Sequence, residues 1–326
     1  MTYIIIALVI ILFVATLVQI LRVSELLSEI KGKDVNQVTD EDNNTQGILF
    51  LLIGFGFLIF VIWQMVTWNH LLLPPASSVH GAQIDILMKM SMGLILIVFF
   101  VLSPVLFYFM YKYRGKKSNK AYFFSHNNKL EVVWTVIPTI ILTGFIIFGL
   151  KTWDKAMNVE VTESTTIIEV YAKQFNWVAR YSGLDNNLGS ANYKLVKGRN
   201  ILGVDMLDSN AIDDKVTTEV HLVIDKPVLL KFRSQDVIHS AFLPHFRVQM
   251  NCVPGMVTQF GFTPTKTTAQ MKESEGQDFE YILLCNKICG AAHYNMQMKF
   301  VVETQAEYDA WYASQQNLES KLLTQK

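Results

Sequence analysis

Residues 132–181 read VVWTVIPTIILTGFIIFGLKTWDKAMNVEVTESTTIIEVYAKQFNWVARY, and the pattern of apolar residues changes halfway along them. Val132–Leu150 is an uncharged run close to the roughly 20 residues that a helix needs to cross a bilayer. From Thr165 to Tyr181, β-branched and aromatic residues dominate instead, which is typical of strands. The sequence therefore predicts a membrane-anchored all-β protein, with transmembrane helices followed by a β-barrel or sandwich domain.

Three further uncharged runs of similar length precede this stretch; they are Ile4–Leu21, Ile48–Trp68 and Met90–Tyr111. They are apolar on all sides, as helices facing lipid are. The first run could instead be a cleaved signal peptide, but it lacks a basic start and a small-residue cleavage site. We therefore expect four retained transmembrane helices.

The basic residues of the loops predict the orientation of these helices. Six Lys or Arg residues lie within 112–129, whereas residues 69–88 contain none. Because basic loops stay on the cytoplasmic side, residues 112–129 are expected inside, and everything after Lys151 outside. The sequence thus predicts a multi-pass protein of a bacterial-type inner (plasma) membrane, with its β domain on the outer, periplasmic face.

The composition agrees with a membrane protein, because 51% of the residues are hydrophobic and only 17% are charged. The 28 basic and 28 acidic residues cancel, which excludes a strongly basic nucleic-acid surface. Three cysteines are too few for a disulfide scaffold. Four regions are predicted: two extra transmembrane helices (1–72), a transmembrane hairpin (73–153), the external β domain (154–304), and a C-terminal helix and tail (305–326).

Six stretches of the external half have strand composition and are separated by turn residues; they are Thr165–Tyr181, Thr217–Ile224, Pro227–Arg233, Met256–Phe262, Phe279–Leu284 and Gln297–Val302. Apolar residues after Glu303, from Ala306 to Leu318, predict a short amphipathic helix.

Residues 285–296 read CNKICGAAHYNM and place two thiols, an imidazole and a thioether in one loop: Cys285, Cys289, His293 and Met296. Copper electron-transfer sites use Met as a weak axial ligand, whereas zinc rarely binds a thioether. Three other interpretations stay open from spacing alone: a Cys285–Cys289 disulfide, a structural zinc site, and a Met296 that is simply part of the core. The remaining cysteine, Cys252, is expected to be a small buried hydrophobe.

A further ligand is needed, and two histidines could supply it. His239 lies at a strand end in the stretch DVIHS (236–240), before a loop predicted over Pro244–Gly255. His245 is the rival. Loops cluster at one end of a β-sandwich, so either imidazole could reach the cysteine loop.

The stretches DVIHS (236–240), VPG (253–255) and C-x3-C-G-x2-H-x2-M (285–296) together resemble subunit II of haem-copper cytochrome c oxidases. QFNW (174–177) and the residues from Glu131 to Pro138 strengthen the resemblance. It covers Pro75 to Val302 and leaves the first two helices as an N-terminal addition.

The resemblance implies a cupredoxin-like β-barrel that holds two copper ions, bridged by the thiolates of Cys285 and Cys289. His239 would bind one copper and His293 the other, and Met296 and the backbone carbonyl of Lys287 would complete the site. His245 would then have no role. The other candidate for this chain is a membrane-anchored copper- or zinc-binding module, such as a metallochaperone.

The function implied is electron relay within a proton-translocating cytochrome c oxidase. Cytochrome c, or a c-type cytochrome domain, would deliver electrons to the copper centre, which passes them to haem in subunit I, where oxygen is reduced to water. Trp177 would lie in the region that receives electrons. Glu131 at the cytoplasmic mouth of the fourth helix is either a helix-start carboxylate or, by resemblance, the proton-uptake carboxylate.

Three residues depart from the family pattern. Lys287 replaces a glutamate whose carboxylate, in the family, ligates a magnesium or manganese ion at the subunit interface. Copper is therefore expected to be retained, and the interface metal to be lost or bound differently. Phe175 replaces the first tryptophan of the electron-accepting region, and Met256 replaces an arginine. Four acidic residues are candidates for attracting a basic cytochrome or are solvated loop residues; they are Asp205, Asp208, Asp213 and Asp214.

Overall fold

The computed structural model describes residues 2–30, 32 and 37–318 of the chain. The chain divides into two compact units. One consists of residues 1–69 and 95–127, and the other of residues 70–94 and 128–326.

The first unit contains helices α1 (Thr2–Ile30), α2 (Asp40–Trp68) and most of α3 (Val79–Lys112). Helix α2 begins with a reciprocal pair of hydrogen bonds between Thr39 and Asp42, which satisfies backbone N–H groups that have no partner within the helix. Helical backbone hydrogen bonds continue beyond the two apolar runs. Helices α1 and α2 therefore extend well into the sequence between the runs, which was predicted to be a loop.

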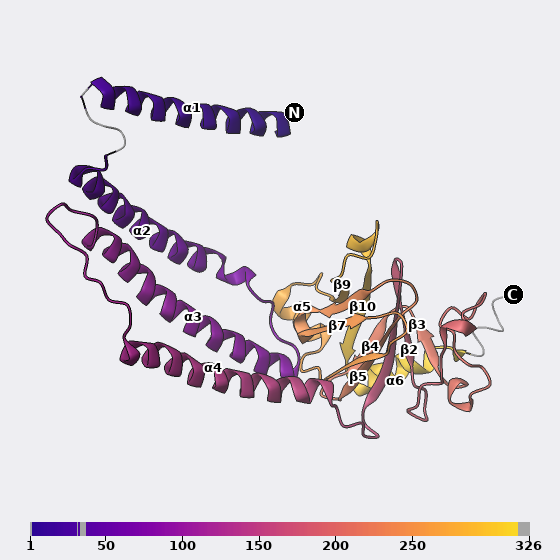
Figure 1. The fold of residues 1–326 in the computed structure, drawn as a ribbon. Helices are drawn as coiled ribbons and strands as arrows, with labels where there is room; N and C mark the ends of the chain where they lie inside the picture. The colour runs from indigo at the N-terminus through magenta and orange to yellow at the C-terminus, as the bar shows by residue number, and fades with distance from the viewer. Residues whose placement is uncertain (1, 31, 33–36, 319–326) are drawn as a thin grey trace. The chain divides into compact units, whose positions relative to one another are not determined.

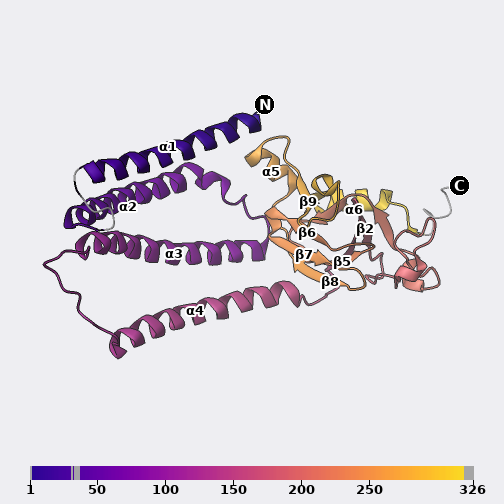
Figure 2. The same cartoon turned by 45° about the horizontal axis from the view of Figure 1, so that its top comes forward.

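Helices α2 and α3 lie side by side in Figures 1 and 2. Their contact depends on a small residue, because a Cβ atom at Gly54 would lie only 2.3 Å from the ring of Phe107. One helical turn further along, the rings of Phe57 and Phe99 meet edge to face at 6.1 Å. Small residues that let two helices approach closely are typical of packing in membranes.

Four helices within the described residues are long and apolar enough to cross a membrane, in agreement with the four predicted runs. They span Ile4–Ile30, Asp40–Leu71, Val79–Lys112 and Asn128–Met157 (α4).

The second unit is built on two five-stranded sheets, drawn mostly in orange in Figure 1. The first has the order β3-β2-β1-β5-β8, with bounds Lys215–Thr217, Asn176–Tyr181, Thr166–Lys173, Val228–Ser234 and Thr258–Phe262. The second has the order β4-β10-β9-β6-β7, with bounds Val220–Val223, Gln297–Glu303, Tyr281–Cys285, His239–Leu243 and Val248–Cys252.

The inner faces of the two sheets form one core. Strand β1 runs parallel to β5 and β10 runs parallel to β4, whereas the other paired strands are antiparallel. Ile168, Val170 and Leu230 of the first sheet belong to the same buried cluster as Leu222, Leu283 and Phe300 of the second. Burial of such side chains on both inner faces stabilises a sandwich and fixes the ends of its strands.

Each of the six predicted strand stretches contains a strand, and residues 165–181 form a hairpin of β1 and β2. The loop predicted over Pro244–Gly255 is wrong in part, because Val248–Cys252 forms β7. Only the two end residues of β7 are buried, and polar Gln249 and Asn251 flank the partly buried Met250 between them. The strand therefore has little apolar signal and is held by pairing with β6. Helix α5 (Thr268–Glu275) was also not predicted.

The predicted C-terminal helix is present as α6 (Gln305–Ser314). The prediction that this helix includes Leu318 is wrong, because Leu318 lies beyond the end of α6. Its side chain is buried in a second, smaller cluster with Tyr171 and Val178.

Candidate metal centre

Residues 286–296 form the loop between β9 and β10, and backbone hydrogen bonds fold the loop back on itself. The Cys285 N–H donates to the Met296 carbonyl at 3.1 Å, and the Asn286 N–H donates to Ser240 on β6 at 2.9 Å. Gly290 adopts a φ of +143°, which side-chain-bearing residues rarely adopt. The loop is therefore attached at its base both to its own far end and to the strand that begins with His239.

The two thiols lie at the centre of a group of donor atoms. The Sγ atoms of Cys285 and Cys289 are 3.9 Å apart, and both thiols are free. His239 Nδ1 lies 3.8 Å from the Cys285 sulfur, and His293 Nδ1 lies 3.6 Å from the Cys289 sulfur. Each sulfur thus has an imidazole nitrogen of its own. Sulfur atoms of a disulfide are about 2.05 Å apart, so the disulfide alternative is not the arrangement seen here.

Two weaker donors complete the group. The thioether sulfur of Met296 lies 3.9 Å from the Cys289 sulfur, and the carbonyl oxygen of Lys287 lies 3.3 Å from the Cys285 sulfur. Met296 is 1% exposed, so it faces the site from within the core. The structure therefore brings together all six residues that the sequence analysis named as copper ligands.

These spacings fit metal binding. Two ligand atoms that bind one tetrahedral metal at 2.0–2.3 Å are themselves about 3.5 Å apart. The neighbouring donor atoms here lie 3.3–3.9 Å apart. His239, Cys285 and Cys289 also form a compact trio whose ligand atoms lie within 4.8 Å of one another. Soft sulfur donors with imidazole suit copper, and a thioether favours copper over zinc.

A carboxylate orients the first imidazole. Asp236 Oδ1 lies 2.8 Å from His239 Nε2, so the ring donates its Nε2 proton there and keeps the Nδ1 lone pair for a metal. Burial opposes ionisation of Asp236, but hydrogen bonds from the Gln174 N–H, the His239 ring and the Val237 N–H keep its pKa below the usual value. The carboxylate is thus held ionised behind the predicted ligand.

The two buried thiols have raised pKa values. Burial, with the nearby Cys285 sulfur, raises the pKa of Cys289 to about 11. Burial raises the pKa of Cys252 to about 12. Cys252 has no exposed surface and belongs to the core, so the prediction that it is a small buried hydrophobe is confirmed. Thiolate is the metal-binding form, and Cys289 must therefore lose its proton when a metal binds.

Aromatic side chains lie beside the site. The ring of Trp177 is 3% exposed and its centroid is 6.1 Å from that of His239. Phe175 is partly buried and so close to Gly290 that a Cβ atom there would lie 2.8 Å from its ring. The Gln174 amide donates to the Cys289 carbonyl. The QFNW turn therefore packs directly on the metal-site loop.

The rival histidine is not in the site. The His245 ring packs edge to face on Phe279 and Tyr281, at 5.0 and 5.6 Å, and burial lowers its pKa. Unlike His239, it is not the first residue of a strand beside the thiols. It lies in the short helical turn Pro244–Phe246 after β6. The structure thus selects His239 over His245 as the imidazole near the thiols.

The acidic residues considered for docking a cytochrome take part in building the fold. Asp214 is fully buried and pairs with Arg180 at 2.7 Å. Asp208 accepts the Ser190 N–H, and Asp213 accepts the Leu184 N–H. Asp205 accepts the Leu207 N–H. These contacts are those of loop-forming aspartates.

No role is predicted from the sequence for Asp236 or Gln174, although they lie in the stretches DVIHS (236–240) and QFNW (174–177). The usable signal for Asp236 is its place three residues before His239. Gln174 carries no such signal, because it is 115 residues away from the carbonyl that it contacts. Glu131 lies in the first turn of α4, at the helix end where a carboxylate is favoured.

Two family descriptions match the chain: "Cytochrome C oxidase subunit II, transmembrane domain" over residues 66–152, and "Cytochrome C oxidase subunit II, periplasmic domain" over residues 166–305.

Similar proteins are found among curated sequences and solved structures. The chain is 29% identical to the alternative cytochrome c oxidase subunit 2 of Bradyrhizobium diazoefficiens over 270 residues, which cover 82% of this chain and 91% of that protein. It is 26% identical to the Synechocystis cytochrome c oxidase subunit 2 over 288 residues, 82% of each protein. A crystal structure of the periplasmic domain of subunit II from Bradyrhizobium japonicum aligns at 22% identity and TM-score 0.32, covering 48% of this chain and 96% of that one.

Proposed function

The chain belongs to the cytochrome c oxidase subunit II family, and from this premise we propose that it holds a binuclear copper centre through which the oxidase receives electrons. It is a component of a respiratory haem-copper oxidase, and its β domain after apolar helices is the cupredoxin-like architecture expected of that family. The matches cover both the helical hairpin and the β domain, so they do not favour a metallochaperone.

The observation that carries the proposal is the arrangement of the donors around the two thiols. Cys285 and Cys289 lie side by side, and each has a different imidazole within 3.8 Å. This arrangement is symmetric about the sulfur pair, as two metals bridged by two thiolates would need. A single tetrahedral zinc would not need both Met296 and the Lys287 carbonyl as well.

The copper pair, when bound, supplies one-electron redox chemistry. The protein contributes a rigid and largely dry ligand cage. The Cys289 thiol gives up its proton on metal binding, Asp236 holds the His239 ring, and the hydrogen bonds at the base of the loop keep Cys285 beside β6. Electron transfer is fast when ligands move little between oxidation states, and ligands supported by packing and hydrogen bonds move little.

The partners follow from the family. We infer that cytochrome c, or a c-type cytochrome domain, delivers electrons near Trp177, and that haem in subunit I accepts them and reduces oxygen to water with proton translocation. The β domain then lies on the outer face of a bacterial-type plasma membrane. Glu131, in the first turn of α4, is proposed as the proton-uptake carboxylate on the cytoplasmic side.

The side chain of Lys287 separates this protein from the family pattern. The backbone carbonyl oxygen of Lys287 still lies 3.3 Å from the Cys285 sulfur, and a residue of any type could supply this carbonyl. A cationic side chain cannot replace a carboxylate as a magnesium ligand. We therefore predict that the purified oxidase contains the two coppers but no magnesium bound through residue 287. Metal analysis of wild-type and Lys287→Glu oxidase checks this, and a stoichiometric magnesium in the wild type that Lys287→Ala removes would contradict it.

The experiment that tests the function is metal analysis and electron paramagnetic resonance of the purified oxidase. We expect two coppers bound to this chain and the spectrum of a mixed-valence pair. Cys285→Ser should abolish that spectrum, whereas Cys252→Ala removes a thiol outside the site and should leave it intact. One zinc per chain, or a Cys285–Cys289 disulfide in the intact oxidised protein, would refute the proposal.

A further inference from the structure

A cavity of about 360 Å³ opens where the start of α3 and the end of α4 meet the edge strand β8. All of its lining residues belong to the second unit. Val79, Val159 and Phe262 give it an apolar floor. The cavity is remote in sequence from the copper ligands, and the electron relay does not use it.

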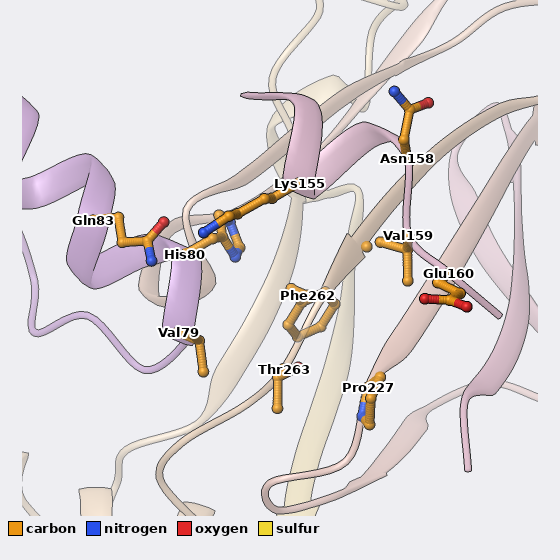
Figure 3. Close-up of a pocket in the computed structure, with 11 residues that line it drawn as sticks. Val79, His80, Gln83, Lys155, Asn158, Val159, Glu160, Pro227, Phe262 and Thr263 are labelled. Carbon is orange, nitrogen blue, oxygen red and sulfur yellow. The ribbon is translucent and has the colours of Figure 1, made fainter. Parts of the chain in front are cut away.

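Two opposite charges line the cavity, apart from each other. Figure 3 shows the Lys155 side chain reaching toward Gln83 and His80, whereas the Glu160 carboxylate lies on the other side of Phe262. Within the described parts of the chain, neither the Lys155 amine nor the Glu160 carboxylate has a hydrogen bond or ion pair. His80 is 7% exposed, and its Nδ1 atom also lacks a partner among the described residues. The cavity thus has a cationic end and an anionic end over an apolar floor.

The cavity lies at the depth of lipid headgroups. The apolar run of α4 ends at Leu150, and Lys155 is five residues further on, so it lies roughly 7.5 Å beyond the hydrocarbon. The headgroup zone on each side of a bilayer is about 5–8 Å thick. A ligand that enters this cavity sideways from the bilayer would bring its headgroup to Lys155.

We propose that this cavity binds the phosphoethanolamine headgroup of a membrane phospholipid. Lys155 and the Gln83 amide donate hydrogen bonds to the phosphate, and Glu160 accepts hydrogen bonds from the ammonium group. Phe262 lies between these two ends and contacts the two methylene groups that join the phosphate to the ammonium group. A choline headgroup cannot donate a hydrogen bond to Glu160, and a glycerol headgroup has no cation for it.

Native mass spectrometry of the purified oxidase tests the proposal. The complex is exchanged into micelles that contain equal amounts of phosphatidylethanolamine, phosphatidylcholine and phosphatidylglycerol, and retained lipids are counted. We expect Lys155→Gln to lower retention of phosphatidylethanolamine about tenfold, as the loss of a charge-assisted hydrogen bond does. Glu160→Gln should remove the preference for ethanolamine over choline while lipid is still bound.

Lys151→Gln and Glu163→Gln are the matched controls, since each removes the same charge from an exposed residue that does not line the cavity. Equal retention in Lys155→Gln and Lys151→Gln, equal retention of the three lipids by the wild type, or a protein segment of another subunit crosslinked at Val79 in place of lipid would each overturn the proposal. Copper content provides an independent check that every variant is folded.

Discussion

At the scale of single residues, the geometry of the candidate metal site depends on side chains that are not themselves predicted ligands. His239 has two ring nitrogens, and only one can face the thiols with a free lone pair. Asp236 decides which one, because its Oδ1 accepts a hydrogen bond from the His239 Nε2–H at 2.8 Å, and its Oδ2 accepts one from the Gln174 N–H at 2.7 Å. The carboxylate therefore links the QFNW turn to the first imidazole.

Asp236→Asn tests this link. The amide can still fill the space, but it cannot hold the imidazole with a negative charge, and metal affinity depends on that support. We expect copper affinity to fall by about 10- to 100-fold with the fold retained. A copper-chelator competition titration of the purified protein measures the change. Asp278→Asn, an exposed carboxylate outside the site, is the control, and equal affinities in the two variants would refute the role given to Asp236.

At the scale of secondary-structure elements, a buried ion network joins the strands of the first sheet. Glu169 of β1 pairs with Arg180 of β2 at 2.9 Å and with Arg233 of β5 at 2.6 Å. Arg180 also pairs with Asp214, just before β3. Loss of one partner from such a network leaves an uncompensated buried charge, which is strongly destabilising.

Asp214 makes the stability of this network depend on pH. Burial raises the pKa of Asp214 to about 6, although Arg180 acts in the opposite direction. The unfolded chain releases that proton near pH 4. This group therefore stabilises the fold most below pH 4, and its contribution is lost as the pH rises through 6.

Asp214→Asn mimics the protonated form of this carboxyl group. The variant should therefore not show the loss of stability that wild type shows as the pH rises through 6. Thermal unfolding of the β domain, followed by near-ultraviolet circular dichroism between pH 4 and 7, measures the difference between wild type and variant. We expect the difference in unfolding temperature between wild type and Asp214→Asn to change between pH 4 and 7, and the difference between wild type and Asp278→Asn to stay constant over that range. A constant difference would mean that Asp214 is ionised throughout.

The pairing of α2 with α3 depends on Gly54, and a second glycine provides a matched comparison. Gly54→Leu would force the Phe107 ring away, whereas Gly56 has no neighbour within 4 Å and Gly56→Leu should be tolerated. Cysteines placed at Phe57 and Phe99 report the contact by disulfide crosslinking in membranes. We expect the crosslink yield to drop with Gly54→Leu and to be unchanged with Gly56→Leu. Equal yields in the two variants would show that the contact between the helices does not depend on Gly54.

At the scale of the whole molecule, four helices within the described residues are long and apolar enough to cross a membrane. From the distribution of Lys and Arg we predict that the candidate metal centre lies on the outer side of that membrane, opposite the basic loop of residues 112–127. Its residues 115–126 are all exposed, so it can be labelled.

Cysteine labelling tests this topology. Ser118→Cys should react with a membrane-impermeant maleimide only in inside-out vesicles, and Glu163→Cys only in intact cells or right-side-out vesicles. Both residues are exposed, so a lack of labelling reflects the side of the membrane. Labelling of both positions from one side would mean that α4, the helix between them, does not span the membrane.

The sequence by itself determined the features that are recorded locally. The four apolar runs mark the helices that are long enough to cross a membrane, and stretches rich in β-branched and aromatic residues mark strands of the β domain. Four of the donor residues lie in or next to one loop, so their spacing in the sequence predicted most of the group that the structure brings together; they are Cys285, Cys289, His293 and Met296.

Only the tertiary structure decided what depends on contacts between distant parts of the chain. It brings His239 to Cys285 and places His245 against Phe279, although both histidines lie in the same stretch of sequence. It pairs β1 with β5 and makes a strand of the weakly apolar Val248–Cys252. The physical reason is that the sequence pattern around a residue shows whether its side chain is buried. Which other side chain it then contacts is determined by how the two sheets pack around one core.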